Sequence, residues 1–440
     1  MSKVGLQKYI DKLPNIRTII PQGRITDVSG LVIGATGPRV PVGEICIIRS
    51  NYNQNEIFAE IVGFREDKIL LMPLGDMEGI SSGDIVESIG ETLKVSVSDG
   101  CLGRVLDGLG RPMDDKGPIK EDRFVSVNAT PPNPLKRRRI KDSLGVGIKA
   151  IDGCLTIGRG QRIGIFSGSG VGKSTLLGMI ARNTEADINV IALIGERGRE
   201  VKEFIENSLG EEGLKRSVVI VATSDQPALI RIKGALTATA IAEYFRDKGK
   251  DVLFMMDSVT RFSMAQREVG LTIGEPPTTK GYPPSVFALM PKLMERAGTS
   301  DVGSITGIYT VLVDSDDMNE PIADTARSIL DGHIVLDRKI ASKNIWPAID
   351  ILPSLSRVMP EVVTKEHMQA NYRLREMLTT YRDAEDLINI GAYVDGSNPK
   401  IDAAKKIIDA ITDFLTQAVE EKYTYKEEVE MLIKLIGKNK

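Results

Sequence analysis

A glycine-rich segment between an apolar run and a helix start carries the clearest chemical signal in the sequence. It reads Ser167-Gly-Ser-Gly-Val-Gly-Lys-Ser-Thr175 and follows the apolar run Arg162–Phe166. Glycines let a loop bring its backbone N–H groups close to a polyphosphate, and the positive end of the next helix points at the same place. The segment predicts a P-loop whose phosphate-contacting residues are Ser169, Gly170, Val171, Gly172, Lys173, Ser174 and Thr175.

Two side chains at the end of this loop define the predicted ligands. The ammonium of Lys173 can reach terminal phosphates, and the hydroxyl of Ser174 can ligate Mg²⁺. Strict spacing asks for glycine where the chain has Ser167, but a small residue still permits the turn. We therefore expect ATP and Mg²⁺ as cofactors.

Two other apolar runs end in carboxylates. The run Val252–Met256 leads into Asp257, which beside a P-loop strand can hold the hydration shell of Mg²⁺, or else only cap a helix. The run Ile191–Ile194 leads to Glu196, which can polarise the water that attacks a phosphoanhydride. Both residues are predicted to lie at the nucleotide.

The charged residues after Glu196 extend this site. Arg197 is included among the predicted catalytic residues, and Glu200 could reach the metal through a water molecule. The alternative for Glu200 is a surface charge in a charged loop.

A third stretch, Trp346–Arg357, supplies an aromatic ring and a cation. Trp346 is the only tryptophan and could stack on adenine, or it could be a core or interface aromatic. Arg357 could be an arginine finger that stabilises the detaching γ-phosphate, which is worth roughly 10³–10⁵ in rate where measured. The alternative for Arg357 is an ordinary surface arginine.

Composition excludes several other classes of protein. The chain has 440 residues with a formal net charge of -3, so nothing global favours a nucleic-acid or membrane surface. Three scattered cysteines and two histidines are too few for a disulfide framework or a His-based metal site. No apolar run reaches the roughly 20 residues of a membrane span. The basic run Lys136–Arg139 could bind nucleic acid, but beside a proline-rich link it is better interpreted as a solvated connector.

The elements that must position these residues follow from hydrophobic periodicity. Short strands with regular turn signals between about residues 19 and 90 predict a small closed β-barrel. The alternation of strands and helices over residues 161–345 predicts a doubly wound, mostly parallel sheet with the ligand at its carboxyl edge. We expect its strands at 162–166, 188–194, 217–223, 251–256 and 304–313, and its helices at 173–182, 200–208, 227–247 and 320–330.

The predicted fold is therefore α/β, a RecA-like P-loop core with an N-terminal β-barrel and a C-terminal helical domain. Apolar faces after residue 360 are too few for an independent fold, so these helices should pack on the core. The expected domains are an amphipathic N-terminal segment (1–18), the barrel (19–92), the ATPase core (93–359) and the helical domain (360–440). The first of these either caps its own domain or docks a partner.

With these motifs in place, the chain resembles the rotary ATP synthase α/β-like P-loop ATPases, and within them the flagellar or type III protein-export ATPase. The resemblance covers nearly the whole chain. The matching segments are Ser167–Arg182, Ala192–Val201, Ala240–Asp247, Gly274–Pro277, Gly281–Phe287, Pro347–Asp350 with Ser354–Ser356, Tyr381–Ile388, Gly391–Tyr393 and Gly396–Pro399.

The resemblance implies a homohexamer with ATP at each interface. Lys173, Ser174, Glu196 and Asp257 would belong to one side, and Arg357 would act in trans on the neighbour's nucleotide. The implied partners are a cytoplasmic export regulator at the N-terminus, a coiled-coil stalk protein in the central pore, export substrates and their chaperones, and indirectly a membrane export gate. The implied location is cytoplasmic, peripheral at the inner face of the cell membrane.

Three residues depart from the family pattern. Ser167 replaces a usual Ala or Gly, Trp346 stands where a tyrosine is usual, and Ile345 replaces a common His. The last two could alter the preference for adenine.

Several functions share this core. The preferred hypothesis is ATP hydrolysis in flagellar protein export, with an injectisome export ATPase or the catalytic β-type subunit of a rotary ATP synthase as alternatives. A non-catalytic subunit is disfavoured because Gln usually stands where this chain has Glu196. An RNA translocase is disfavoured because the N-terminal region lacks an aromatic and basic platform, so no nucleic-acid partner is expected.

Overall fold

The computed structural model describes residues 19–50, 56–313 and 317–437. The prediction for residues 1–18 lies outside these ranges. The chain divides into two compact units, the first formed by residues 1–94 with 272–274 and the second by residues 95–271 with 275–440.

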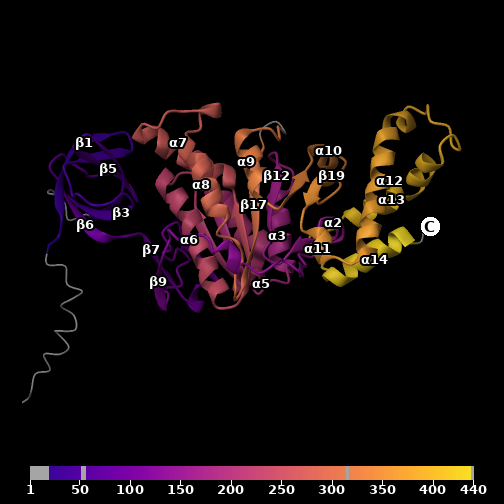
Figure 1. Cartoon of the computed structure of the whole chain (residues 1–440), viewed down its shortest axis with the longest axis horizontal. Helices are drawn as coiled ribbons and strands as arrows, with labels where there is room; N and C mark the ends of the chain where they lie inside the picture. The colour runs from indigo at the N-terminus through magenta and orange to yellow at the C-terminus, as the bar shows by residue number, and fades with distance from the viewer. Residues whose placement is uncertain (1–18, 51–55, 314–316, 438–440) are drawn as a thin grey trace, which may run out of the picture. The chain divides into compact units, whose positions relative to one another are not determined.

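The first unit contains the predicted barrel, whose strands curl into a closed sheet (Figure 1). Neighbouring strands pair in the order β1-β2-β5-β4-β3-β6, all antiparallel. Alternate side chains such as Ile33, Ile61 and Leu71 point inward and form a separate apolar core. The strands are β1 (Gln22–Ser29), β2 (Val32–Ala35), β3 (Glu44–Arg49), β4 (Glu56–Arg65), β5 (Lys68–Pro73) and β6 (Ile85–Thr92).

The second unit is built on a nine-stranded sheet, and this confirms the predicted α/β core. Eight strands follow the order β19-β18-β12-β17-β15-β13-β14-β8, parallel except where β19 pairs with β18, while β16 pairs antiparallel with β17. The bounds are β8 (Arg104–Asp107), β12 (Arg162–Ser167), β13 (Ile188–Ile194), β14 (Ser217–Ala222), β15 (Asp251–Asp257), β16 (Gly298–Thr299), β17 (Ser304–Leu312), β18 (Gly332–Leu336) and β19 (Ile349–Ser356). The edge strand β8 was not expected.

Helices cover this sheet, and most of the expected ones are present. The long helix α6 (Ala228–Asp247) is almost entirely buried and packs on β13, β14 and β15. The helix expected at 200–208 is instead α4 (Gly198–Glu203) followed by a π-helical turn, η4 (Phe204–Leu209), and then α5 (Gly210–Lys215). The other helices of the core are α2 (Lys149–Cys154), α3 (Lys173–Asn183), α7 (Val259–Ile273), α8 (Pro284–Met294), α9 (Pro321–Ile329) and α10 (Arg338–Ser342).

Short elements lead into the core from the barrel. They include two further pairs of strands, β7 with β9 and β10 with β11, and two single 3₁₀ turns. Their bounds are β7 (Lys94–Val97), η2 (Asp99–Cys101), β9 (Arg123–Ser126), η3 (Pro134–Lys136), β10 (Ser143–Leu144) and β11 (Ile157–Gly158), and a further turn, η5 (Thr279–Gly281), precedes α8.

The interpretation of Lys136–Arg139 as a solvated connector is wrong for two of its residues. Arg137 donates to the carbonyl of Ala297 at 2.8 Å and forms an ion pair with Glu295 at 3.6 Å. Arg138 donates to the carbonyl of Ser300 at 2.9 Å. These bonds hold the link against the core because the arginines satisfy backbone carbonyls that would otherwise lack donors.

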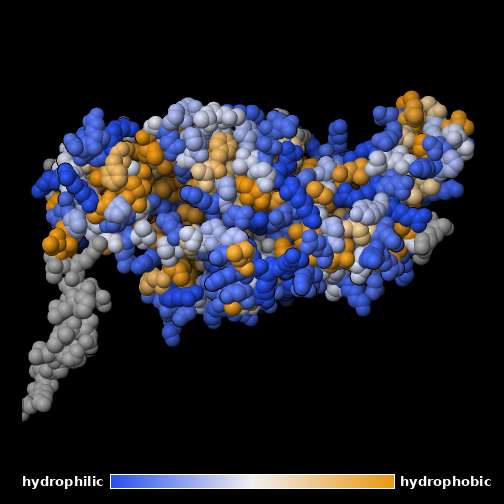
Figure 2. Space-filling model, viewed as in Figure 1, coloured by the Kyte–Doolittle hydropathy of each residue, from blue (hydrophilic) through white to orange (hydrophobic). Residues whose placement is uncertain are grey.

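The C-terminal helices pack on the core as predicted (Figure 1). Leu374, Ile411 and Leu432 belong to the same hydrophobic cluster as the core of the sheet. The tip where α12 and α13 meet is rich in exposed apolar side chains (Figure 2). No helix in the described ranges is long and apolar enough to cross a membrane. The helices are α11 (Met359–Val362), α12 (Lys365–Asn389), α13 (Pro399–Leu415) and α14 (Tyr425–Gly437).

A pair of buried carboxyl groups joins α14 to α2. Asp152 and Glu428 both have 0% exposed surface. Asp152 accepts hydrogen bonds at 2.9 Å from the backbone N–H groups of Val146 and Gly147, whereas no donor among the described residues reaches either oxygen of Glu428. Burial and the hydrogen bond between the two carboxyl groups keep the proton on Glu428, which donates it to Asp152.

Burial and the neighbouring Asp152 carboxylate raise the pKa of Glu428, although Lys149 opposes the shift and Glu185 adds to it. Burial also raises the pKa of Asp152. Because the folded pKa of Glu428 lies above the unfolded value, its contribution to stability is complete below the unfolded pKa and is lost as the pH rises.

We predict that Glu428→Gln stabilises the protein at pH 8, because an amide donates to Asp152 without needing a proton from solvent. The gain should grow between pH 5 and pH 8 and reach on the order of 1–3 kcal/mol. Thermal unfolding at both pH values measures it. Glu430→Gln, an exposed change on the same helix, is the control, and a gain that does not depend on pH would contradict the assignment.

Candidate nucleotide-binding and active site

A cavity of about 880 Å³ opens at the carboxyl edge of the sheet, around the glycine-rich loop. This is the edge where the alternation of strands and helices predicted the ligand. The cavity brings together most of the predicted residues, namely Ser169, Gly170, Gly172, Lys173, Ser174, Thr175, Glu196, Arg197, Glu200 and Trp346.

The loop has the local geometry that phosphate binding requires. Gly170 and Gly172 have φ values of 77° and 79°, in the left-handed region that favours glycine. Helix α3 begins at Lys173 and has no side-chain cap, so no side chain competes for the N–H groups of its first turn. The side chain of Val171 is buried at 2% exposure, which leaves only its backbone to face a ligand.

Lys173 lies between two carboxylates. Its Nζ forms ion pairs with Asp257 and with Oε1 of Glu196, the latter at 3.6 Å. Burial alone would lower the pKa of Lys173, but the charges of Asp257 and Glu196 outweigh burial and raise it. The lysine is therefore held protonated at the start of α3, where it can neutralise phosphate charge.

Glu196 has the protonation behaviour of a general base. Burial, followed by repulsion from Asp257, raises the pKa of Glu196 to about 7, while Lys173 opposes the shift. A base is most effective when its pKa lies near the working pH. Glu196 follows strand β13 directly after Gly195, whose φ of 73° turns the chain at the edge of the sheet.

The oxygen ligands near the loop suit Mg²⁺. Ser174 is exposed in the cavity and Glu200 lines it, while Asp257 is only 4% exposed and lies behind Lys173. Hydroxyl and carboxylate oxygens are what a hard cation prefers, and Mg²⁺ usually keeps several waters. In the described ranges no three His, Cys, Asp or Glu residues gather into a metal cage. These residues therefore fit a Mg²⁺ ion whose remaining ligands are water and the phosphates of a bound nucleotide.

Trp346 forms one wall of the cavity. Its ring lies over Gly172, where an added Cβ would stand only 2.8 Å from the ring. The indole Nε1 donates to Oδ1 of Asn344 at 3.1 Å, which fixes the orientation of the ring. An aromatic surface beside the P-loop is placed to stack on a nucleotide base.

Arg357 is the one predicted site residue that lies away from this cavity. Ser356 pairs with Gly332 at the start of β18, whereas Leu336 at the end of β18 pairs with Ser167 beside the P-loop. Four residues of strand span about 13 Å. Arg357 is thus an exposed cation at the amino edge of the sheet, opposite its own P-loop.

Sequence reasoning missed several residues of the cavity, of which Arg261 and Gln417 have the longest polar side chains. Arg261 lines it from α7 and its buried Nε has no hydrogen-bond partner among the described residues. Its position four residues after Asp257, just past a strand end, was the available signal. Gln417, 3% exposed, comes from the segment between α13 and α14. Nothing in the local sequence marked it.

Hydrogen bonds from Gln417 hold the segment of the cavity wall that contains Trp346. The backbone N–H of Gln417 donates to the carbonyl of Trp346 at 2.8 Å. Its side chain accepts from the N–H of Lys149 and donates to the carbonyl of Gly147, both at 2.9 Å. The C-terminal helical region thereby helps to shape the predicted adenine site.

We predict that Gln417→Ala weakens ATP binding about tenfold, since two buried hydrogen bonds at roughly 1 kcal/mol each are lost. Trp346 is the only tryptophan in the chain, so its fluorescence during an ATP titration reports binding directly. Gln369→Ala, on the exposed face of α12, serves as the control. Equal affinities in all three proteins would show that Gln417 does not support the site.

Comparison with known proteins identifies the family. Models of known families match the chain at residues 25–90 (ATP synthase alpha/beta family, beta-barrel domain), 147–356 (ATP synthase alpha/beta family, nucleotide-binding domain) and 363–434 (T3SS EscN ATPase C-terminal domain).

Relatives match over almost the whole length. The chain is 56% identical to the flagellum-specific ATP synthase of Bacillus subtilis, over 98% of this chain and 99% of that protein. It is 51% identical to the type 3 secretion system ATPase of Xanthomonas euvesicatoria, over 93% of each. The solved structure of assembled EscN in complex with its central stalk EscO, from enteropathogenic E. coli, superposes with a TM-score of 0.87 at 47% identity, covering 94% of this chain and 100% of that one. The chain therefore belongs to the family of flagellum-specific ATP synthases and type 3 secretion system ATPases, within the ATP synthase alpha/beta family.

Proposed function

We propose that the protein is the ATP hydrolase of a flagellar type III protein-export apparatus, which hydrolyses ATP at homohexamer interfaces to energise export. The observation that carries this proposal is the position of Glu196, whose carboxylate lies 3.6 Å from the ammonium of Lys173 and has a pKa of about 7. A carboxylate in this place and protonation range suits activation of water beside a phosphate.

The charged and aromatic residues in and beside the cavity have distinct roles in this reaction. Lys173 and the N–H groups at the start of α3 bind the terminal phosphates, and Glu196 orients and polarises the attacking water. Arg197 and Arg261 supply further positive charge, and the ring of Trp346 stacks on adenine. Ser174, with Asp257 and Glu200 through water, would hold Mg²⁺, which neutralises phosphate charge when bound.

The position of Arg357 supports a reaction shared between subunits. It lies across the sheet from its own P-loop, so we propose that it acts on the nucleotide of a neighbouring copy. The solved EscN structure is described as assembled, which supports a ring. We propose that this ring contains six subunits.

The partners that we propose are inferred from the relatives and from the family resemblance. The EscN complex contains a central stalk, and we propose an equivalent coiled-coil stalk for this chain. We further propose a cytoplasmic regulator that binds residues 1–18, export substrates with their chaperones, and an indirect link to a membrane export gate. The protein would work in the cytoplasm, docked at the inner face of the membrane.

A second candidate is an injectisome export ATPase. The 51% identity to the Xanthomonas protein and the match to the T3SS EscN C-terminal domain favour it, whereas the 56% identity to the Bacillus protein favours the flagellum. Deletion of the gene followed by a swimming assay separates the two.

We predict that Glu196→Gln lowers the rate of ATP hydrolysis by about 10²–10⁴-fold, because an amide cannot accept the proton of the attacking water. Binding of ATP, followed through Trp346 fluorescence, should persist. Glu203→Gln, an exposed change in the following helix, is the matched control. Near-normal hydrolysis by Glu196→Gln would remove the role assigned to this carboxylate.

We predict that Arg357→Ala lowers hydrolysis about 10³–10⁵-fold with little change in the affinity of an isolated chain for ATP. In the unaltered protein, specific activity should rise cooperatively with protein concentration as subunits assemble. Hydrolysis rates and sedimentation, measured over the same concentration range, test both points. Full activity in a strictly monomeric preparation would count against a role in trans.

A further inference from the structure

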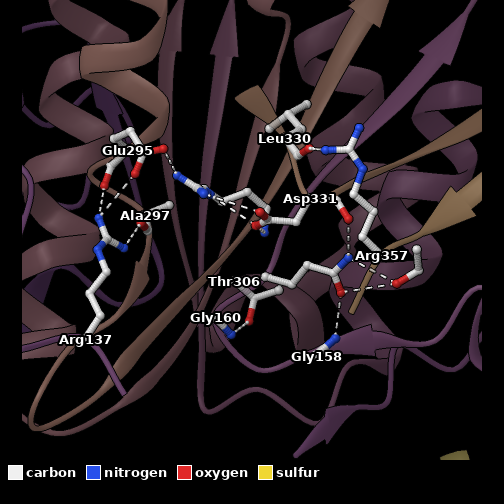
Figure 3. Close-up of polar contacts among 12 residues, drawn as sticks. Arg137, Gly158, Gly160, Glu295, Ala297, Thr306, Leu330, Asp331 and Arg357 are labelled. Carbon is white, nitrogen blue, oxygen red and sulfur yellow. Dashed lines mark hydrogen bonds and ion pairs between the residues drawn. The ribbon is translucent and has the colours of Figure 1, made fainter. Parts of the chain in front are cut away.

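A polar network at the amino edge of the sheet holds Arg357 and the residue before it (Figure 3). The backbone N–H of Arg357 donates to the carbonyl of Asp331 at 3.0 Å, and its Nη1 donates to the carbonyl of Leu330 at 3.3 Å. The guanidinium of Arg357 makes no ion pair with any of the described residues. The direction of this cation is therefore set by the turn between α9 and β18.

Gln161 joins that turn to the residue before Arg357. Its side chain has 0% exposed surface, and its Nε2 donates to the carbonyl of Asp331 at 3.2 Å and to Oγ of Ser356 at 3.1 Å. Its Oε1 accepts from the N–H of Gly158 at 2.8 Å. A buried amide with all these partners has a single permitted orientation. It therefore fixes the position of the backbone from which the Arg357 side chain extends.

The carboxylate of Asp331 fastens the same turn to strand β12. It accepts from the backbone N, Nε and Nη2 of Arg162 at 3.0, 3.2 and 3.3 Å. Arg162 also pairs with Glu295, which in turn pairs with Arg137 (Figure 3). Strand β12 begins at this network and ends at the P-loop, so one strand supports both the chain's own phosphate site and the arginine that faces away from it.

We propose that Gln161 and Asp331 are positioning residues for Arg357, which aim its guanidinium at the nucleotide of a neighbouring subunit. This inference rests on the trans role proposed for Arg357. A shift of about 1 Å in a catalytic group can cost on the order of 10²-fold in rate. Loss of the network should therefore lower turnover while the chain's own nucleotide site stays intact.

The first test compares Gln161→Leu and Asp331→Asn with Asp324→Asn, a control change in an exposed ion pair on α9. Asp331→Asn keeps the backbone carbonyl that Arg357 contacts and removes only the negative charge of the side chain that is paired with Arg162. This variant therefore tests the proposal even if Gln161→Leu does not fold. Thermal unfolding and Trp346 fluorescence check folding and ATP affinity. We expect kcat to fall about 10- to 100-fold with the affinity changed less than about twofold, and the control to be unchanged. Unchanged kcat in a folded Asp331→Asn protein would overturn the inference.

The second test separates a role in trans from a general structural one. Each network variant is mixed with Glu196→Gln before assembly, and the retention of ADP with aluminium fluoride, which mimics the detaching phosphoryl group, is measured per subunit. A network variant has a sound P-loop and Glu196, and the Glu196→Gln subunit offers a sound arginine. We therefore expect mixing to restore retention.

The control mixture is Arg357→Ala with Glu196→Gln. If this mixture recovers and the network variants do not, the positioning role is wrong and the trans role of Arg357 stands. If neither mixture recovers, the trans role proposed for Arg357 fails and the inference fails with it.

Discussion

The ammonium of Lys173, buried between Asp257 and Glu196 at the carboxyl edge of the sheet, is the interaction on which the rest of this site depends. Three parts of the fold meet there: the helix after β12, the end of β15, which β17 separates from β12 in the sheet, and the loop after β13. A charge in such a place is costly unless it is paired. The parallel register of these strands brings the partners together, and their carboxylates keep the lysine protonated.

The same arrangement sets the protonation of Glu196. Two carboxylates near one ammonium cannot both be fully neutralised, and burial adds to the difficulty. Asp257 lies deeper and accepts hydrogen bonds from Lys173 and from Thr310, the latter at 2.7 Å. Glu196 is left with the raised pKa. Glu196 can therefore exchange a proton near neutral pH.

The sheet also separates the P-loop from Arg357, because the two lie at opposite edges. Strand β12 ends at the phosphate-binding loop and begins at Arg162, which is bound to Asp331 beside Arg357. A cation at one edge and a P-loop at the other suit a molecule whose sites are completed by neighbouring copies. The C-terminal helices are tied into the nucleotide side as well, because Gln417 holds the backbone of Trp346.

Local patterns of glycines, apolar runs and turn residues were enough to predict the P-loop, the two carboxylates that follow strands, the β-barrel and the parallel core. Family resemblance then indicated the hexamer and the action of Arg357 in trans, which no local pattern carries. Three-dimensional packing was needed to show that Arg137 and Arg138 dock on the core, that Arg261 and Gln417 line the cavity, and that Asp152 meets Glu428. The physical reason is distance along the chain: Gln417 and Lys149 are far apart in sequence, and their hydrogen bond exists only because packing of the helices buries both.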